Sequence, residues 1–97
     1  MATYISLLNF TDQGIRNIKD SPDRFEDFKA MAEKMGLTVK SIYWTVGEYD
    51  LVLTLEGSES EALAAALMKT GSLGNVRSQT LRGFSEDEMR QIIGKMP

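Results

Sequence analysis

The chain has 97 residues, the usual size of one compact domain, which leaves no room for separate catalytic and substrate domains. Its hydrophobic fraction of 42% and charged fraction of 26% are ordinary globular values and argue against a disordered, fibrous or membrane-spanning chain. Eleven Lys and Arg against 14 Asp and Glu give a net charge of −3. We therefore expect no nucleic-acid partner, because domains that bind phosphate backbones are normally basic.

The chain contains no cysteine and no histidine. Disulfides, thiolate zinc sites, imidazole bases and cysteine nucleophiles are therefore excluded, and we expect no metal and no cofactor. No signal-peptide pattern is visible, and no apolar run approaches the ~20 residues that cross a bilayer. We expect a cytoplasmic protein with no membrane partner.

The first third of the chain predicts a strand followed by a helix. Residues 3–10 are short, rich in Tyr, Ile, Leu and Phe, and end at a turn-prone Thr-Asp-Gln-Gly, which favours a strand. Apolar residues then recur at helical spacing as far as Met35. Ser21 and Pro22 suit the cap and the first position of a helix. We expect the main helix to begin there, after a shorter turn, and to stop at Gly36.

The rest of the chain predicts a hairpin, a helix, a strand and a last helix. Residues 38–46 and 50–56 are β-rich, and the three residues between them are enough only for an antiparallel hairpin. Apolar spacing over 62–70 predicts a second helix, and residues 75–81 a fourth strand. Residues 85–96 begin with a capping-box pattern and continue with Met and Ile at helical spacing.

This order, β-α-β-β-α-β plus one helix, predicts an α+β domain over residues 1–97 with the ferredoxin-like split βαβ topology. Both main helices would cover one face of a four-stranded antiparallel sheet, with Leu51, Leu53 and Leu55 toward the core. We expect the other face to carry a half-apolar set: Tyr4, Ser6, Leu8, Tyr43, Thr45, Val52 and Thr54. Such a face predicts a homo-oligomer, and we expect a dimer.

The run Gly47-Glu48-Tyr49-Asp50, followed by Leu-Val-Leu-Thr-Leu, resembles the signature of the GYD-domain family. The resemblance includes residues 42–45 and 71–77, and so spans most of residues 1–84. Here Glu48 separates the Gly from the Tyr. The resemblance implies a dimeric α/β-barrel type of ferredoxin-like fold and no particular reaction. We expect Gly47 to form a tight turn with positive φ.

The same strand entrance, with the helix after it and the later Gly74-Asn75-Val76, is also similar to the effector domains of leucine-responsive regulators. That likeness implies a domain that oligomerises and binds amino acids at subunit interfaces. The sequence shows no attached helix-turn-helix, so the likeness implies a stand-alone sensor or ligand binder.

The candidate ligand-binding residues gather around the hairpin. Tyr43, Trp44 and Tyr49 supply aromatic surface for a pocket or for an interface. Asp50 can bond backbone N–H groups of the hairpin, or can act as a base if burial raises its pKa. Arg77 can clamp a carboxylate, or can be solvated or paired with an acidic residue.

We therefore expect a homo-oligomer that binds a small organic molecule near the hairpin or at a subunit interface, in a regulatory or sensing role. One alternative is a cofactor-free dimeric-barrel enzyme acting on a small polar or aromatic substrate. Its base would be Asp50, with Tyr43, Tyr49 or an arginine as electrophilic helper. A further alternative is a purely structural association unit, whose sheet face would pack solid without a cavity.

Overall fold

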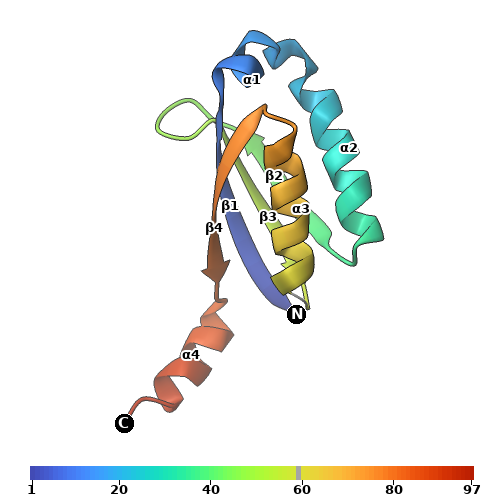
Figure 1. Ribbon diagram of the computed structural model, residues 1–97. Coiled ribbons are helices and arrows are strands. Elements are labelled where there is room, and N and C mark those ends of the chain that lie inside the picture. Colours follow the sequence, from blue (N-terminus) through green and yellow to red (C-terminus); the bar gives the residue numbers. More distant parts are fainter. Residues whose placement is uncertain (59) are drawn as a thin grey trace.

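A computed structural model of the chain describes residues 1–58 and 60–97 (Figure 1). Its elements follow the predicted order, with a short helix and a 3-10 turn before the main helix. They are β1 (Ala2–Phe10), α1 (Asp12–Arg16), η1 (Ile18–Asp20), α2 (Ser21–Lys34), β2 (Thr38–Trp44), β3 (Leu51–Gly57), α3 (Ser60–Ser72), β4 (Val76–Gly83) and α4 (Glu86–Gly94).

The four strands form one antiparallel sheet in the order β2-β3-β1-β4. The first and last strands of the chain therefore lie side by side, and α2 and α3 cover the same face of the sheet (Figure 1). The predicted ferredoxin-like topology is confirmed. Within residues 1–58 and 60–97, no helix is both long enough and apolar enough to cross a membrane.

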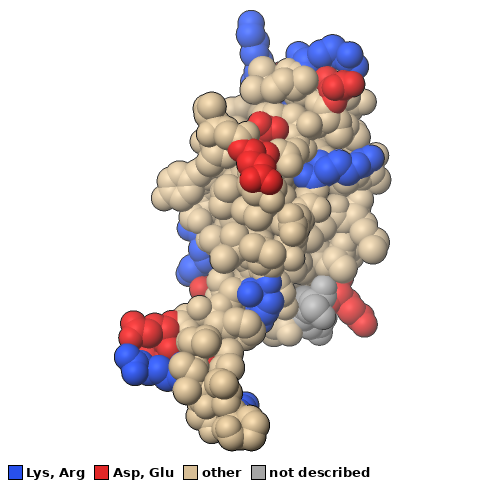
Figure 2. Space-filling view, turned by 90° about the vertical axis from the view of Figure 1, so that its left-hand side faces the viewer, with Lys and Arg blue, Asp and Glu red and all other residues tan. Residues whose placement is uncertain are grey.

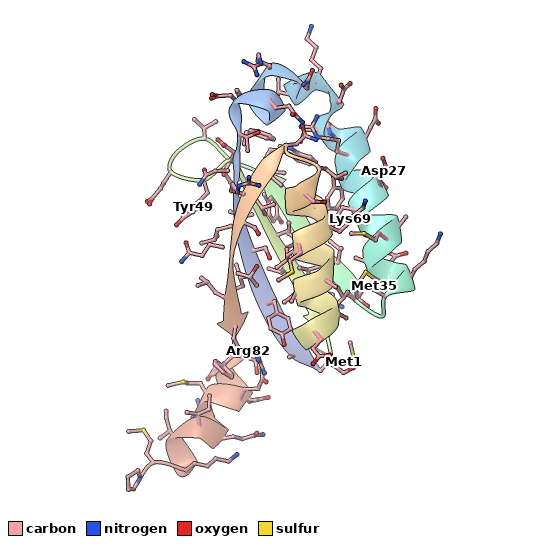
Figure 3. All side chains as sticks on the ribbon, in the orientation of Figure 1. Met1, Asp27, Met35, Tyr49, Lys69 and Arg82 are labelled. Atoms are coloured by element: carbon pink, nitrogen blue, oxygen red, sulfur yellow. The ribbon has the colours of Figure 1, made fainter. Side chains whose placement is uncertain are left out.

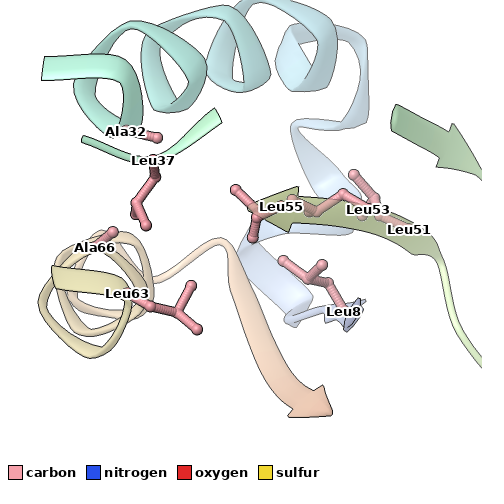
Figure 4. Packing of buried hydrophobic residues seen from close by; sticks show 8 residues of the cluster. All are labelled: Leu8, Ala32, Leu37, Leu51, Leu53, Leu55, Leu63 and Ala66. Atoms are coloured by element: carbon pink, nitrogen blue, oxygen red, sulfur yellow. The ribbon is translucent and has the colours of Figure 1, made fainter. Parts of the chain in front are cut away.

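The core lies between this sheet and the two helices, and leucine dominates it (Figure 4). Alternate residues of β3 point to the same side, so the three leucines of that strand are buried together as predicted. Leu37, at the end of the α2–β2 turn, closes one end of the cluster. The buried apolar residues are Leu8, Ala32, Leu37, Leu51, Leu53, Leu55, Leu63 and Ala66.

The prediction for the faces of β1 was wrong. Tyr4, Ser6 and Leu8 were expected on the uncovered side, but they pair with Leu55, Leu53 and Leu51 and lie on the helix side. The register of β1 on β3 decides the side, and a shift by one residue reverses every side chain of a strand. The buried Ser6 hydroxyl is satisfied by the Thr80 hydroxyl, with 2.8 Å between the two oxygens.

The loop between β2 and β3 contains Gly47 with φ of 147°, which confirms the positive φ predicted there. The Thr45 N–H donates to the carbonyl of Asp50 at 2.8 Å and closes the base of this loop. The loop stands out from the sheet on the side opposite the helices (Figure 1).

The C-terminal helix α4 begins with the predicted capping box. The Glu88 N–H donates to the Ser85 hydroxyl at 3.1 Å, and the Ser85 N–H donates to the Glu88 carboxylate at 2.9 Å. The helix then projects away from the sheet (Figure 1), and the whole molecule measures 50 × 31 × 18 Å. Met89, Ile93 and Met96 are therefore exposed.

At the other end of the molecule, α1 packs tightly on the loop before β4. Thr11 donates through its N–H to the Asn75 carbonyl at 3.0 Å and through its hydroxyl to the Gly74 carbonyl at 2.5 Å. A Cβ atom on Gly14 would overlap the Asn75 carbonyl oxygen. Only glycine fits at this position, because backbone atoms occupy the space a side chain would need.

Candidate functional site

The sheet face opposite the helices, called the open face below, presents two cross-strand rows of side chains. One row runs through Tyr43, Val52, Leu7 and Gln79, and the next through Ser41, Thr54, Ile5 and Leu81. None of these side chains is charged. Figure 2 shows mostly uncharged side chains across the middle of this face, with an acidic group just above the middle and the other charges nearer the edges.

Two of the predicted site residues lie on the open-face side. Tyr43 is 66% exposed at the β2 edge. Tyr49 comes from the hairpin loop, and its hydroxyl donates to Gln79 Oε1 at 3.3 Å. Figure 3 shows Tyr49 on the side of the sheet away from the helices. These two tyrosines therefore frame the open face from β2 and from the loop.

Asp50 holds the hairpin against β1. Its Oδ2 accepts a hydrogen bond from the Phe10 N–H at 2.8 Å, and its own N–H donates to the Leu8 carbonyl at 2.9 Å. The sequence predicted that the Asp50 carboxylate would accept from N–H groups of the hairpin itself. Its partner is instead the Phe10 N–H of β1, a strand distant in the sequence. The observed arrangement uses the carboxylate to join two strand ends.

Trp44 lies on the opposite side of the sheet from Tyr43. Its indole N–H donates to the Ser21 hydroxyl at 3.0 Å, and its ring meets the Phe25 ring edge-on with centroids 6.0 Å apart. Neighbouring strand residues point to opposite faces, so these two aromatic residues cannot line one site within a single chain.

Arg77 is also drawn away from the hairpin. Its guanidinium donates to the Gly71 carbonyl near the end of α3 at 3.1 Å. A cation at the C-terminal end of a helix is favourably placed. The structure therefore brings Tyr43 and Tyr49 to the open face. Arg77 leaves β4 on the same side, opposite Asn9, but its guanidinium bonds to the end of α3. Trp44 and Asp50 have their contacts elsewhere. The binding role of the five residues stays a prediction.

A cavity of about 250 Å³ lies between the sheet, α2 and α3, on the side opposite the open face. Its walls are mainly apolar, and its polar lining comes from the start of α2, the end of α3 and the loop that follows. The lining residues are Leu8, Ser21, Arg24, Phe25, Asp27, Phe28, Met31, Ile42, Leu51, Leu53, Leu67, Lys69, Thr70, Leu73, Asn75 and Val76.

Arg24 is the unusual member of this cavity lining. Its Nη1 donates to the Asn17 carbonyl at 2.8 Å, but its Nη2 is buried and has no hydrogen-bond partner within the described part of the chain. A buried charged donor left without a partner is costly. Figure 3 shows Asp27 on α2 and Lys69 on α3, the helices that flank the cavity.

This cavity was not predicted from the sequence. The apolar positions that line it read as ordinary core stripes, and Arg24 stands among other charged residues of an amphipathic helix. The lining residues come from two helices and from all four strands or their flanking loops, so they are dispersed along the chain. Only the folded structure brings them together.

The chain matches the protein family described as GYD domain over residues 4–93. A curated relative, the glutamine synthetase and cystathionine beta-lyase binding protein of Thermus thermophilus, is 30% identical over 85 residues. The matched region covers 87% of this chain and 90% of the relative.

Two solved structures share the fold. A feast or famine regulatory protein from M. tuberculosis, complexed with L-methionine, has a TM-score of 0.65 at 21% identity, covering 88% of this chain and 51% of that one. A hypothetical protein from Pyrococcus horikoshii has a TM-score of 0.61 at 23% identity, covering 89% and 93%. The predicted likeness to regulator effector domains is therefore confirmed at the level of the fold.

Proposed function

Because this chain belongs to the GYD domain family, we propose that it is a regulatory binding domain that acts as a homodimer. In this proposal two copies pair through their open faces, and the dimer binds other molecules and catalyses no reaction itself. The dimer and the binding role are linked, because pairing through the open face would determine which other surfaces of each copy remain available to bind a partner.

The observation that carries the proposal is the uncharged open face. Ile5, Leu7 and Val52 are only partly covered within one chain, and Leu81 is 43% exposed beside them. A contiguous apolar area rimmed by polar groups is typical of an association surface. A two-fold axis would place the same patch of both copies in contact, which makes the interface self-complementary.

The nature of the partner is suggested by the Thermus thermophilus relative, whose name states that it binds glutamine synthetase and cystathionine beta-lyase. We infer that this chain binds metabolic enzymes of the same kind.

The enzyme alternative has less support. Its proposed base, Asp50, has one carboxylate oxygen engaged by the Phe10 N–H, and the proposed helper Tyr49 is bonded to Gln79. Both groups already have a local structural partner. A general base needs to reach a substrate proton directly or through one water molecule.

Sedimentation equilibrium of the wild type, Leu81→Glu and Ala30→Glu tests the proposed dimer. Burying a charge at position 81 is expected to weaken dimerisation at least about tenfold. The exposed Ala30 on α2 serves as the matched control and leaves the dimer intact. A wild type that remains monomeric at high concentration would contradict the proposal. Biosensor measurements with purified glutamine synthetase and cystathionine beta-lyase test the partner class.

A further inference from the structure

We propose that the cavity between α2, α3 and the sheet binds a small apolar carboxylate, with the Arg24 guanidinium as the anion-binding group. This site lies on the other side of the sheet from the open face. This inference rests on the proposed function in that a regulatory binding domain would sense a small molecule, and the cavity would be the site where that molecule binds.

The apolar part of the ligand is set by the cavity walls. Phe28 and Met31 of α2 face Leu67 of α3 across it, and Ile42 and Leu53 of the sheet form its floor. The cavity has a volume of about 250 Å³, far more than a single water molecule needs. The cavity therefore suits a molecule the size of a six-carbon carboxylic acid.

The charged part of the ligand is set by Arg24. Nη1 donates to the Asn17 carbonyl, while the buried Nη2 keeps an unused donor. Because Nη2 is buried, a carboxylate oxygen reaches it only when the Arg24 side chain shifts toward the cavity, where the oxygen would satisfy that donor with a charge-assisted hydrogen bond.

The balance of charge around the cavity favours a singly charged anion. Arg24 and Lys69 bring two positive charges, and Asp27 brings one negative charge. Neither cation has a carboxylate within salt-bridge distance among the described residues. A monocarboxylate restores neutrality, whereas a phosphate, with about two negative charges, would leave an excess.

Hexanoate is the probe for this site, and Trp44 is the reporter. Trp44 is the only tryptophan of the chain, and it contacts Ser21 and Phe25, which both line the cavity. Hexanoate is expected to change the Trp44 emission saturably, with the same dissociation constant by calorimetry. Hexanamide and hexan-1-ol, which lack the negative charge, are expected to bind at least about tenfold more weakly.

Two substitutions separate the charged and apolar parts of the site. Arg24→Gln is expected to weaken hexanoate at least about tenfold and to leave hexan-1-ol unchanged, since only the charge is lost. Leu67→Phe fills the cavity and should weaken both ligands. Arg16→Gln, an exposed arginine outside the cavity, is the control and keeps wild-type affinity. If Arg24→Gln fails to fold by circular dichroism, the exposed Lys69→Gln replaces it, with a smaller loss expected.

The proposal is overturned if wild-type protein shows no saturable hexanoate binding, if hexanamide binds as tightly as hexanoate, or if Arg24→Gln and Arg16→Gln behave alike. Sedimentation of the same samples separates this result from the dimer. A dimer that does not bind hexanoate refutes the cavity site alone, and a monomer that binds it refutes the proposed dimer alone.

Discussion

The backbone N–H of Phe10 donates a 2.8 Å hydrogen bond to the carboxylate of Asp50, so the last residue of β1 is fixed to the residue that precedes β3. Forty positions separate these two residues in the sequence. The contact ties the hairpin loop to the centre of the sheet, because β1 lies between β3 and β4. The position of Tyr49, one residue earlier, depends on this contact.

We predict that Asp50→Ala lowers the free energy of unfolding by about 1–3 kcal/mol, because the Phe10 N–H loses its charged acceptor. Asp50→Asn should cost less, since an amide oxygen can still accept the bond. Urea unfolding at fixed protein concentration measures both effects. Glu48→Gln, exposed in the same loop, is the control and should be nearly neutral. Equal stability of Asp50→Ala and wild type would show that the hydrogen bond contributes nothing.

We predict an energetic coupling between Trp44 and Ser21 of about 0.5–1.5 kcal/mol in a double-mutant cycle. Their hydrogen bond of 3.0 Å joins β2 to the first residue of α2. The cycle uses Trp44→Phe, Ser21→Ala and the double variant, each unfolded in urea and followed by circular dichroism. If the losses in free energy of unfolding of the two single variants add up to that of the double variant, the two residues act independently.

The apolar side of α4 should act in self-association and contribute little to the stability of one chain. Met89 is 47% exposed and Ile93 is 53% exposed, so replacing both with Ser removes little burial within the chain. Sedimentation equilibrium of this double variant is expected to show a dimer weakened at least about tenfold. Gln91→Ser on the polar side of the same helix should leave the dimer unchanged. Unaltered association of the double variant would exclude α4 from the interface.

The stability of α4 should depend on pH through Glu88. The hydrogen bond from the Ser85 backbone N–H, aided by the Ser85 hydroxyl and the nearby Arg82, holds the Glu88 pKa below its usual 4.5, against an opposing effect of desolvation. Because the folded pKa is lowered, this stabilisation is present above pH 4.5 and is lost as pH falls through the folded pKa.

Amide hydrogen exchange across α4 measures this effect as pH is lowered, after correction for the intrinsic exchange rate. Protection is expected to be constant above pH 4.5 and to fall below it. Glu88→Gln removes the titrating group and should flatten the profile. Ser85→Ala removes one half of the capping box and should cost about 0.5–2 kcal/mol of helix stability at neutral pH. An identical pH profile in wild type and Glu88→Gln would refute the role of Glu88.

Local patterns were enough to predict most of the fold. The alternating leucines of β3, Pro22 at the start of α2 and the Ser85–Glu88 box all act within a few residues of the chain. The faces of β1 were predicted wrongly because Ile5 and Leu7 are as apolar as Tyr4 and Leu8, and only the pairing with β3 distinguishes them.

The candidate site was less predictable than the fold. The sequence drew attention to Trp44 and Tyr43 as neighbours, but the strand pleat separates them onto two faces. The cavity could be identified only from the three-dimensional arrangement of α2, α3 and the sheet. Arg24 could not be distinguished from other surface arginines until its Nη2 was seen to be buried without a partner.

The tight approach of Gly14 to Asn75 also fixes one part of the cavity wall. Asn75 lines the cavity, and the Thr11 and Gly14 backbone clamps the peptide before β4 that carries it. Any larger residue at position 14 would have to displace that peptide, because its Cβ would overlap the Asn75 carbonyl oxygen. A single methyl group there would therefore act as a wedge on a peptide that forms part of the cavity wall, although position 14 itself does not line the cavity.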